Sequence, residues 1–105
     1  MDDRRESQRY PTQRMAQYFL DAKVKGNGRE CTIINVSRKG MGILFHKNEE
    51  IEVGTYIHLE VPDARSLETI NVRGELRWCK TTESALIGGI ELNKILSDVK
   101  FAKLA

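Results

Sequence analysis

Apolar and polar residues alternate with a period of two along most of this chain, which is the pattern of β-strands with one buried face. The alternation is most regular over residues 70–79, where one face carries Ile70, Val72, Gly74, Leu76 and Trp78. Shorter stretches of the same kind start near Met15, Arg29, Ile43, Tyr56 and Leu86. Turn-forming residues separate the stretches, including Gly26-Asn27-Gly28, in which Asn and Gly tolerate positive φ. The pattern therefore predicts six short antiparallel strands.

The period changes after the last strand. Apolar residues then recur at helical spacing, at Leu92, Ile95, Leu96, Val99 and Ala102. Asn93 is a candidate N-cap, so we expect an amphipathic helix of about 10 residues. Closing six strands into a barrel removes exposed edges, and the helix can cover an open end. The predicted fold is mainly β: a six-stranded antiparallel β-barrel with a flexible N-terminal arm and a C-terminal α-helix.

The predicted arm is residues 1–14, which have almost no core-forming pattern. Four of the nine arginines lie there, and they are Arg4, Arg5, Arg9 and Arg14. Ordering a residue costs about 1–2 kcal/mol of backbone entropy, and no apolar stripe offsets that cost here. Tyr10-Pro11 favours an extended exit from the arm. The predicted organisation is therefore an Arg-rich arm over residues 1–14 and one barrel domain with its helix over residues 15–105.

The stretch from Asn35 to Gly42 ends one predicted strand and precedes another. Asn and Ser side chains bond to nearby backbone, and glycines at positions 40 and 42 permit a close backbone approach. One interpretation is a well-capped turn. The other is a turn whose unpaired amides cradle an anion or the edge of a purine.

Composition excludes several classes of function. A formal net charge of +2 does not favour nucleic-acid binding, and the chain has no apolar run long enough to span a membrane, so we expect a cytosolic protein. Cys31 and Cys79 lack metal-cluster spacing, and we interpret both as reduced core thiols. No metal site is expected. Ser37 has no evident base, since His46 and His58 lie in strand patterns, so neither an enzyme nor catalytic residues are expected.

Two short motifs give the chain a family resemblance. Arg5-Glu6-Ser7-Gln8-Arg9 is an R-x-x-x-R in the predicted arm, with Arg4 doubling its start. Asn35-Val36-Ser37-Arg38-Lys39-Gly40 is an (Asp/Asn)-x-Ser-x-x-Gly at the predicted turn. In this order, with six strands and a terminal helix, the whole chain resembles a PilZ domain. PilZ domains are bacterial receptor modules for the second messenger cyclic di-GMP.

The resemblance implies a role for each motif residue. Arg5 and Arg9 would hold phosphate and the Hoogsteen edge of guanine, because a guanidinium binds both in a bidentate manner. Asn35 would accept from guanine N–H or brace the arm. Ser37 would bond a phosphate or a guanine edge, and Gly40 would keep the turn open for the base. Asn35 stands where many members have Asp, so this chain lacks a negative charge at that position.

Four further residues have open interpretations. A doubled arginine such as Arg4 implies two intercalated ligand molecules per domain rather than one. Trp78 is either a core residue or a ring presented to guanine at the rim. Arg38 is either a ligand contact or a solvated charge at a strand edge, and the same holds for Arg77.

The resemblance also implies the function, a stand-alone cyclic di-GMP receptor or adaptor in the bacterial cytoplasm. The arm would fold over the ligand, and the changed surface would signal to an unidentified partner protein in motility, adhesion or polysaccharide control, including biofilm formation. No cofactor, nucleic-acid partner or membrane partner is expected. The alternative is a PilZ-like protein that no longer binds nucleotide and works through protein contacts. A barrel that binds RNA is disfavoured because the aromatic residues, 7% of the chain, are scattered.

Overall fold

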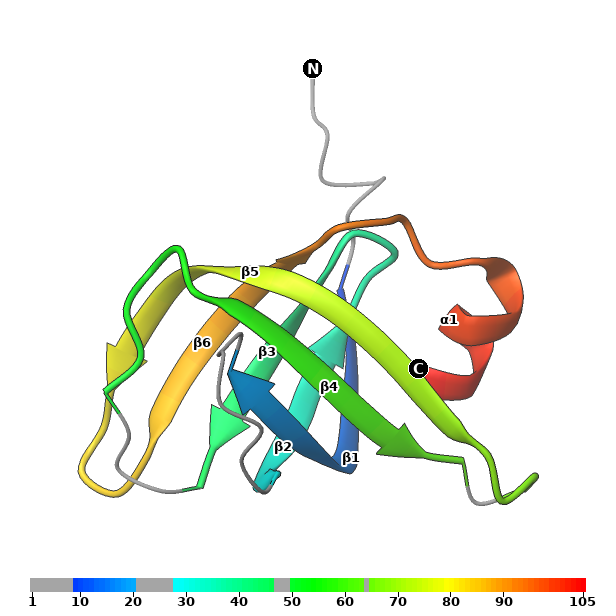
Figure 1. The fold of residues 1–105 in the computed structure, drawn as a ribbon, viewed down its shortest axis with the longest axis horizontal. Helices are drawn as coiled ribbons and strands as arrows, with labels where there is room; N and C mark the ends of the chain where they lie inside the picture. Colours follow the sequence, from blue (N-terminus) through cyan, green and yellow to red (C-terminus); the bar gives the residue numbers. More distant parts are fainter. Residues whose placement is uncertain (1–8, 21–27, 47–49, 64) are drawn as a thin grey trace.

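Six antiparallel strands close into a barrel in the computed structural model of this chain, which describes residues 9–20, 28–46, 50–63 and 65–105. The elements are β1 (Tyr10–Leu20), β2 (Arg29–Val36), β3 (Gly40–Phe45), β4 (Tyr56–Pro62), β5 (Thr69–Thr81), β6 (Leu86–Leu92) and α1 (Asp98–Leu104). Figure 1 shows the strands wrapped around one interior and α1 beside one end of it. The predicted six-stranded antiparallel barrel with a C-terminal helix is confirmed.

The order of strands around the barrel determines which loops meet. It is β1-β2-β3-β6-β5-β4, with β4 pairing back to β1. Because β3 pairs with β6, the turn between β2 and β3 lies beside the end of β6, and β5 lies next along. In Figure 1 this turn is at the top of the barrel, close to the connection that leads from β6 to α1. Segments far apart in sequence therefore share one rim.

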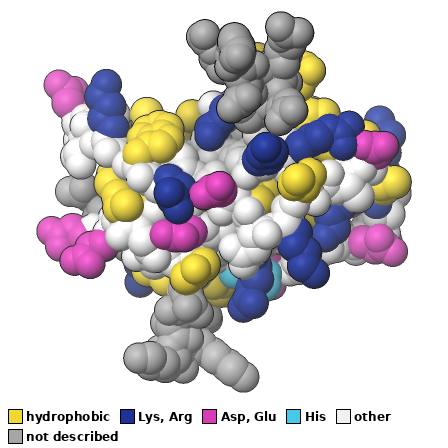
Figure 2. All heavy atoms as spheres, turned by 90° about the horizontal axis from the view of Figure 1, so that it is seen from above, with side chains coloured by type: hydrophobic (Ala, Val, Ile, Leu, Met, Phe, Trp, Pro, Cys, Tyr) yellow, Lys and Arg dark blue, Asp and Glu magenta, His cyan; other side chains and the backbone are white. Residues whose placement is uncertain are grey.

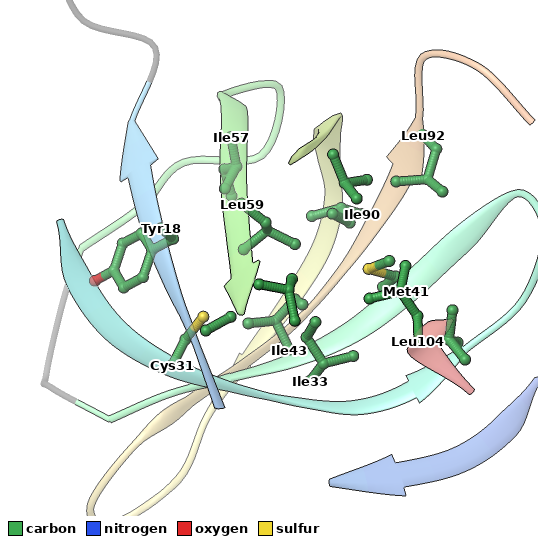
Figure 3. Close-up of a cluster of buried hydrophobic side chains, with 14 of the residues drawn as sticks. Tyr18, Cys31, Ile33, Met41, Ile43, Ile57, Leu59, Ile90, Leu92 and Leu104 are labelled. Carbon is green, nitrogen blue, oxygen red and sulfur yellow. The ribbon is translucent and has the colours of Figure 1, made fainter. Parts of the chain in front are cut away.

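The barrel interior is filled by every second side chain of the strands, as the alternating pattern predicted. In β4 these are Ile57, Leu59 and Val61, and in β5 they are Ile70, Val72 and Leu76. Leu104 of α1 has no exposed surface. It joins the same cluster, as Figure 3 shows. Each such side chain contributes about 1.5–3 kcal/mol by leaving water. Burial of the alternating face explains why the strands form where the pattern predicted them.

Three irregularities interrupt the ladders. Each is an extra residue on one strand: in β1 between Pro11 and Arg14, in β2 between Ile33 and Asn35, and in β5 between Leu76 and Trp78. A bulge changes which face the following side chain occupies, and bulges are common at barrel rims. In β2 and β5 they turn Asn35 and Trp78, the residues that follow the bulge, toward the outside of the barrel.

The barrel starts earlier than the sequence predicted. β1 begins at Tyr10 rather than Met15, because Tyr10 and Pro11 pair with Val36 and Asn35 of β2. Main-chain pairing needs no apolar side chain, so the alternation missed these residues. The rest of the predicted arm, residues 1–8, lies outside the described residues, as do residues 26 and 27 of the predicted hairpin turn.

The predicted start of the helix is wrong. α1 begins at Asp98, and its N-cap is Ser97, whose side chain accepts from the Lys100 amide at 3.2 Å. Asn93 is not a cap, because its amide donates to the Arg73 carbonyl at 3.0 Å and keeps the chain on the barrel. Val99, placed on the predicted apolar stripe, is 64% exposed.

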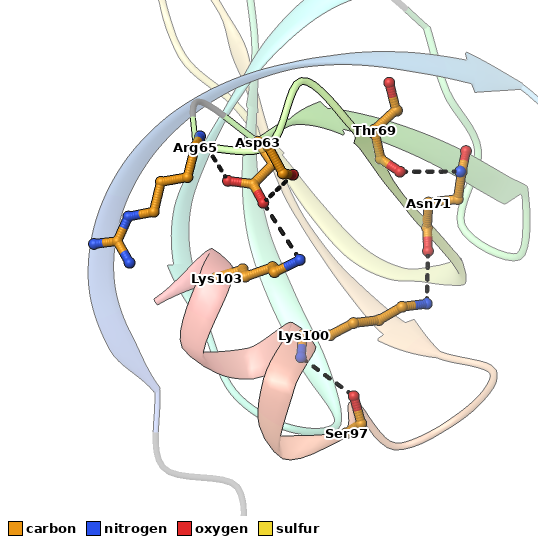
Figure 4. Close-up of polar contacts among 8 residues, drawn as sticks. Asp63, Arg65, Thr69, Asn71, Ser97, Lys100 and Lys103 are labelled. Atoms are coloured by element: carbon orange, nitrogen blue, oxygen red, sulfur yellow. Dashed lines mark hydrogen bonds and ion pairs between the residues drawn. The ribbon is translucent and has the colours of Figure 1, made fainter.

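Polar contacts hold α1 against the barrel (Figure 4). The buried carboxylate of Asp63 lies 3.4 Å from the Lys103 ammonium and accepts from the Arg65 amide and the Ser66 hydroxyl. These interactions lower the pKa of Asp63, the Arg65 amide most and then the Ser66 hydroxyl. Thr12 of β1 donates to the Leu104 carbonyl at 3.3 Å. The helix is thus tied to the β4–β5 connection and to the start of β1.

Candidate functional site

The side chain of Asn35 connects the two sequence motifs. The bulge in β2 places Asn35 opposite Gly42, and its Oδ1 accepts from the Gly42 amide at 2.9 Å. The same oxygen accepts from Nη1 of Arg9 at 3.0 Å. A Cβ on Gly42 would lie 2.6 Å from the Asn35 amide, so only glycine leaves room for this arrangement. Asn35 therefore holds the guanidinium of Arg9 in place.

Ser37 closes the turn between β2 and β3. Its hydroxyl is buried, accepts from the amides of Lys39 and Gly40 at 3.2 and 3.0 Å, and donates to the Gly40 carbonyl at 3.2 Å. The capped-turn interpretation therefore describes this turn, since these two amides already bond to Ser37. Contact between the Ser37 hydroxyl and a ligand stays a prediction.

Gly40 allows β3 to approach β6 closely. A Cβ at this position would lie 2.6 Å from the Ile90 carbonyl oxygen and 3.4 Å from Nη2 of Arg9. A Cβ here would clash with the β6 backbone and lie in van der Waals contact with the arginine. The glycine is thus required by packing, and it also leaves open the surface beside Arg9.

Trp78 lies outside the barrel core. The regular alternation predicted that Trp78 lies on the same face of β5 as Leu76. The extra residue Arg77 instead turns the indole outward, and Trp78 is 46% exposed. The ring covers Gly89, and a Cβ added there would overlap the indole. The core interpretation of Trp78 is therefore wrong. Contact between the exposed indole and a ligand stays a prediction.

These groups line one open pocket of about 280 Å³ at the rim. The two motifs contribute Arg9, Ser37, Lys39 and Gly40. The ends of β5 and β6 contribute Arg77, Trp78, Gly89, Ile90 and Glu91. Figure 2 looks onto the side of the barrel that is uppermost in Figure 1, where Lys and Arg side chains are spread among acidic and hydrophobic ones. Cations beside an exposed aromatic ring suit a ligand with phosphates and bases.

Comparison with known proteins shows the family of this chain. The family model of the PilZ domain matches residues 3–100. The chain belongs to the PilZ domain family. Members of this family are binding and adaptor proteins of cyclic di-GMP signalling rather than enzymes.

One solved structure is similar to this PilZ domain, with a TM-score of 0.68 and 15% sequence identity. The similarity covers 96% of the present chain. The solved structure is that of the Bacillus subtilis inhibitor of motility, MotI/DgrA. The likeness shows the shared fold. This chain spans 48% of the length of that protein. No curated protein matches the sequence.

The predicted site residues of the PilZ domain divide into three groups. Arg9, Ser37, Gly40 and Trp78 line the pocket, and Asn35 holds Arg9 from beneath. Arg38 lies on the other side of the turn, where its guanidinium pairs with Asp98 at 2.5 Å and lies 5.3 Å from the ring centre of Phe101. Arg4 and Arg5 lie outside the described residues.

Among the charged pocket residues of this PilZ domain, sequence reasoning assigned no binding role to Lys39 and Glu91, and it left the role of Arg77 open. Arg77 pairs with Glu91 at 3.3 Å and with Glu75 at 3.7 Å. The signal for Arg77 was its place beside Trp78, but the bulge that brings both to the pocket is invisible in the pattern. Glu91 becomes part of the site through the pairing of β6 with β3 and β5.

The remaining candidate chemistry of the PilZ domain lies elsewhere. Cys31 is buried, which raises the pKa of its thiol to about 12, whereas Cys79 is exposed, so the predicted core position of Cys79 is wrong. Among the described residues, no group of three or more His, Cys, Asp or Glu side chains could hold a metal ion. No helix in the described ranges is long and apolar enough to cross a membrane.

Proposed function

We propose that this PilZ domain binds cyclic di-GMP in the pocket between the β2–β3 turn and the ends of β5 and β6. One observation supports this most strongly: the pocket brings Arg9 of the first motif, the turn of the second motif and the exposed indole of Trp78 to one place. Cyclic di-GMP has two phosphodiesters and two guanines. The pocket offers a cation for the phosphodiesters and an aromatic face for the guanines.

Each group has a role in this proposal. The Arg9 guanidinium, held by Asn35 through Nη1, binds a phosphate or the O6 and N7 atoms of guanine with its remaining N–H groups. The exposed face of Trp78 stacks on a base, which contributes about 1–3 kcal/mol. The turn closed by Ser37 keeps Gly40 open beside Arg9.

The size of the pocket bears on the rest of the ligand. A volume of about 280 Å³ is near the lower end for small-molecule sites. A dinucleotide with two bases therefore extends beyond the pocket, and we propose that Arg4 and Arg5 contact the part that does. The doubled arginine leads us to propose two intercalated ligand molecules rather than one.

The output in this proposal is a changed surface. The ligand covers the rim beside the start of β1, and a partner protein in the bacterial cytoplasm reads the new surface. Motility is one process that fits, since the similar solved structure is that of a motility inhibitor. Adhesion and polysaccharide control are the others that the family suggests.

Calorimetric titration with cyclic di-GMP, cyclic di-AMP and GMP tests the proposal. We expect saturable binding of cyclic di-GMP, and Arg9→Ala weakens it about 10- to 100-fold, because a charge-assisted contact is worth about 1.5–3 kcal/mol. Arg73→Ala is the matched control, since Arg73 is an exposed arginine of β5 that does not line the pocket. Absence of saturable binding by the unmodified protein would contradict the proposal and favour a PilZ domain that acts through protein contacts alone.

A further inference from the structure

The pocket has one acidic residue among several basic ones. Of its lining residues, Arg9, Lys39 and Arg77 are cationic, and Glu91 alone is anionic. Glu91 pairs with Arg77, and in the proposed function its carboxylate would repel the phosphates of the ligand, so it would have to contact a different part of the ligand. Glu91 lies on β6, opposite Gly40 of β3 and Glu75 of β5, and its side chain is 60% exposed.

The position of Glu91 relative to Trp78 suggests which part of the ligand this is. Gly89 and Glu91 are on the same, outer face of β6, because successive side chains of a strand alternate. Two residues along a strand span about 7 Å. The indole of Trp78 covers Gly89, so Glu91 is the next outward side chain beside the ring. A base stacked on the exposed face of Trp78 would have its edge toward the Glu91 carboxylate.

We propose that Glu91 selects guanine over adenine in this site, by accepting hydrogen bonds from the N1–H and N2–H groups of a base stacked on Trp78. This inference rests on the proposed function. An ionised carboxylate only accepts hydrogen bonds, and guanine offers two neighbouring donors on its Watson–Crick edge. Adenine has a lone pair at N1, which faces the carboxylate unfavourably and leaves an acceptor without a partner.

The surroundings of Glu91 support this role. Arg77 Nη1 lies 3.3 Å from Glu91 Oε1, so the guanidinium orients the carboxylate and offsets its charge toward nearby phosphates. A carboxylate has about four lone-pair positions, so one ion pair leaves capacity for base N–H groups. The oxygen of Asn35 already accepts from Gly42 and Arg9. Glu91 thus supplies an anionic acceptor that the Asn35 position lacks.

The test compares two carboxylates that share one arginine. The unmodified protein, Glu91→Gln and Glu75→Gln are titrated with cyclic di-GMP and with cyclic di-AMP. Glu91→Gln keeps the shape but turns an N–H group toward guanine, so we expect cyclic di-GMP affinity to fall about 10- to 100-fold. Affinity for cyclic di-AMP stays the same or rises. Glu75→Gln leaves both affinities unchanged, because Glu75 pairs with Arg77 but does not line the pocket.

Each other outcome has a definite meaning. Tighter cyclic di-GMP binding by Glu91→Gln would show that the carboxylate only repels phosphate, and equal losses in both variants would show that it acts only through Arg77. Either result, or unchanged selectivity in Glu91→Gln, overturns the inference and leaves the proposed function intact. Failure of the unmodified protein to bind any cyclic dinucleotide overturns both. Glu91→Asp should retain part of the preference for guanine, and thermal unfolding confirms that the variants are folded.

Discussion

The two sides of the β2–β3 turn are built from neighbouring residues but offer different chemistry. On the pocket side, Lys39 and Gly40 lie beside groups that are partly open to solvent, including Trp78 at 46% exposure and Arg77, whose side chain is 56% exposed. The cations and the aromatic ring there are gathered around open space. In the proposed function these groups contact the ligand.

On the α1 side, the same turn is bonded to the protein itself. The Arg38 side chain contacts Asp98 and Phe101, and its carbonyl accepts from the Leu96 amide at 2.9 Å. The Lys39 carbonyl accepts from the Leu92 amide at 2.7 Å. One short turn therefore lines the pocket with one set of groups and contacts the helix with another. Substitutions on the two sides should have separable effects.

The largest effect is expected at Gly40, which packs against the β6 backbone and also lines the pocket. In Gly40→Ala the new Cβ would meet the Ile90 carbonyl, which is backbone and cannot move alone. We expect the free energy of unfolding to fall by about 1–3 kcal/mol, measured by urea denaturation, together with a loss of ligand affinity.

Gly89→Ala is the matched variant, because its Cβ overlaps the Trp78 side chain, which can rotate away. It should lose affinity while stability falls by no more than about 1 kcal/mol. The emission spectrum of Trp78, the single tryptophan of the chain, should change in Gly89→Ala alone. Equal destabilisation by both variants would contradict the distinction between the two contacts.

A smaller effect is expected from Arg38→Ala, which acts on the α1 side. It removes an ion pair between exposed groups and a contact with the Phe101 ring, each worth at most about 1 kcal/mol. We expect a lowered melting temperature and a cyclic di-GMP affinity within about twofold of the unmodified protein. An affinity loss as large as that of Arg9→Ala would instead assign Arg38 to the ligand.

The smallest effect concerns pH and the attachment of α1. The pKa of Asp63 is lowered in the folded protein, so its carboxylate stabilises the fold at pH values above its ordinary pKa, near 4. This contribution is lost as the pH falls through the lowered pKa, because the unfolded chain binds the proton first. The difference in melting temperature between the unmodified protein and Asp63→Asn should be constant above about pH 5 and shrink below about pH 4.

Ser66→Ala provides the control for this measurement. Ser66→Ala removes one hydrogen bond to Asp63 but leaves the Arg65 amide and Lys103 in place. In the Ser66→Ala background, the pH-dependent difference in melting temperature caused by Asp63→Asn should therefore be smaller but still present. A constant difference down to the lowest pH measured would show that the Asp63 carboxylate does not stabilise the fold.

Much of the barrel could be read from local patterns. The alternation located β6 over Leu86–Leu92 and the start of β4 at Tyr56, because one face of each strand has to be buried. The spacing of Asn35, Ser37 and Gly40 indicated a polar turn and the PilZ resemblance. Such signals need only neighbouring residues, so they survive without knowledge of the partner strands.

Other features depend on contacts between distant segments. Trp78 leaves the core because β5 has an extra residue opposite β6, and α1 starts late because Asn93 and Leu96 first bond to the barrel. Arg77 and Glu91 join the site only through strand pairing. A period of two determines which strands exist and which face is apolar, since both follow from the geometry of one strand. Strand register, bulges and the composition of the pocket depend on hydrogen bonds between strands, and these form only when the barrel closes.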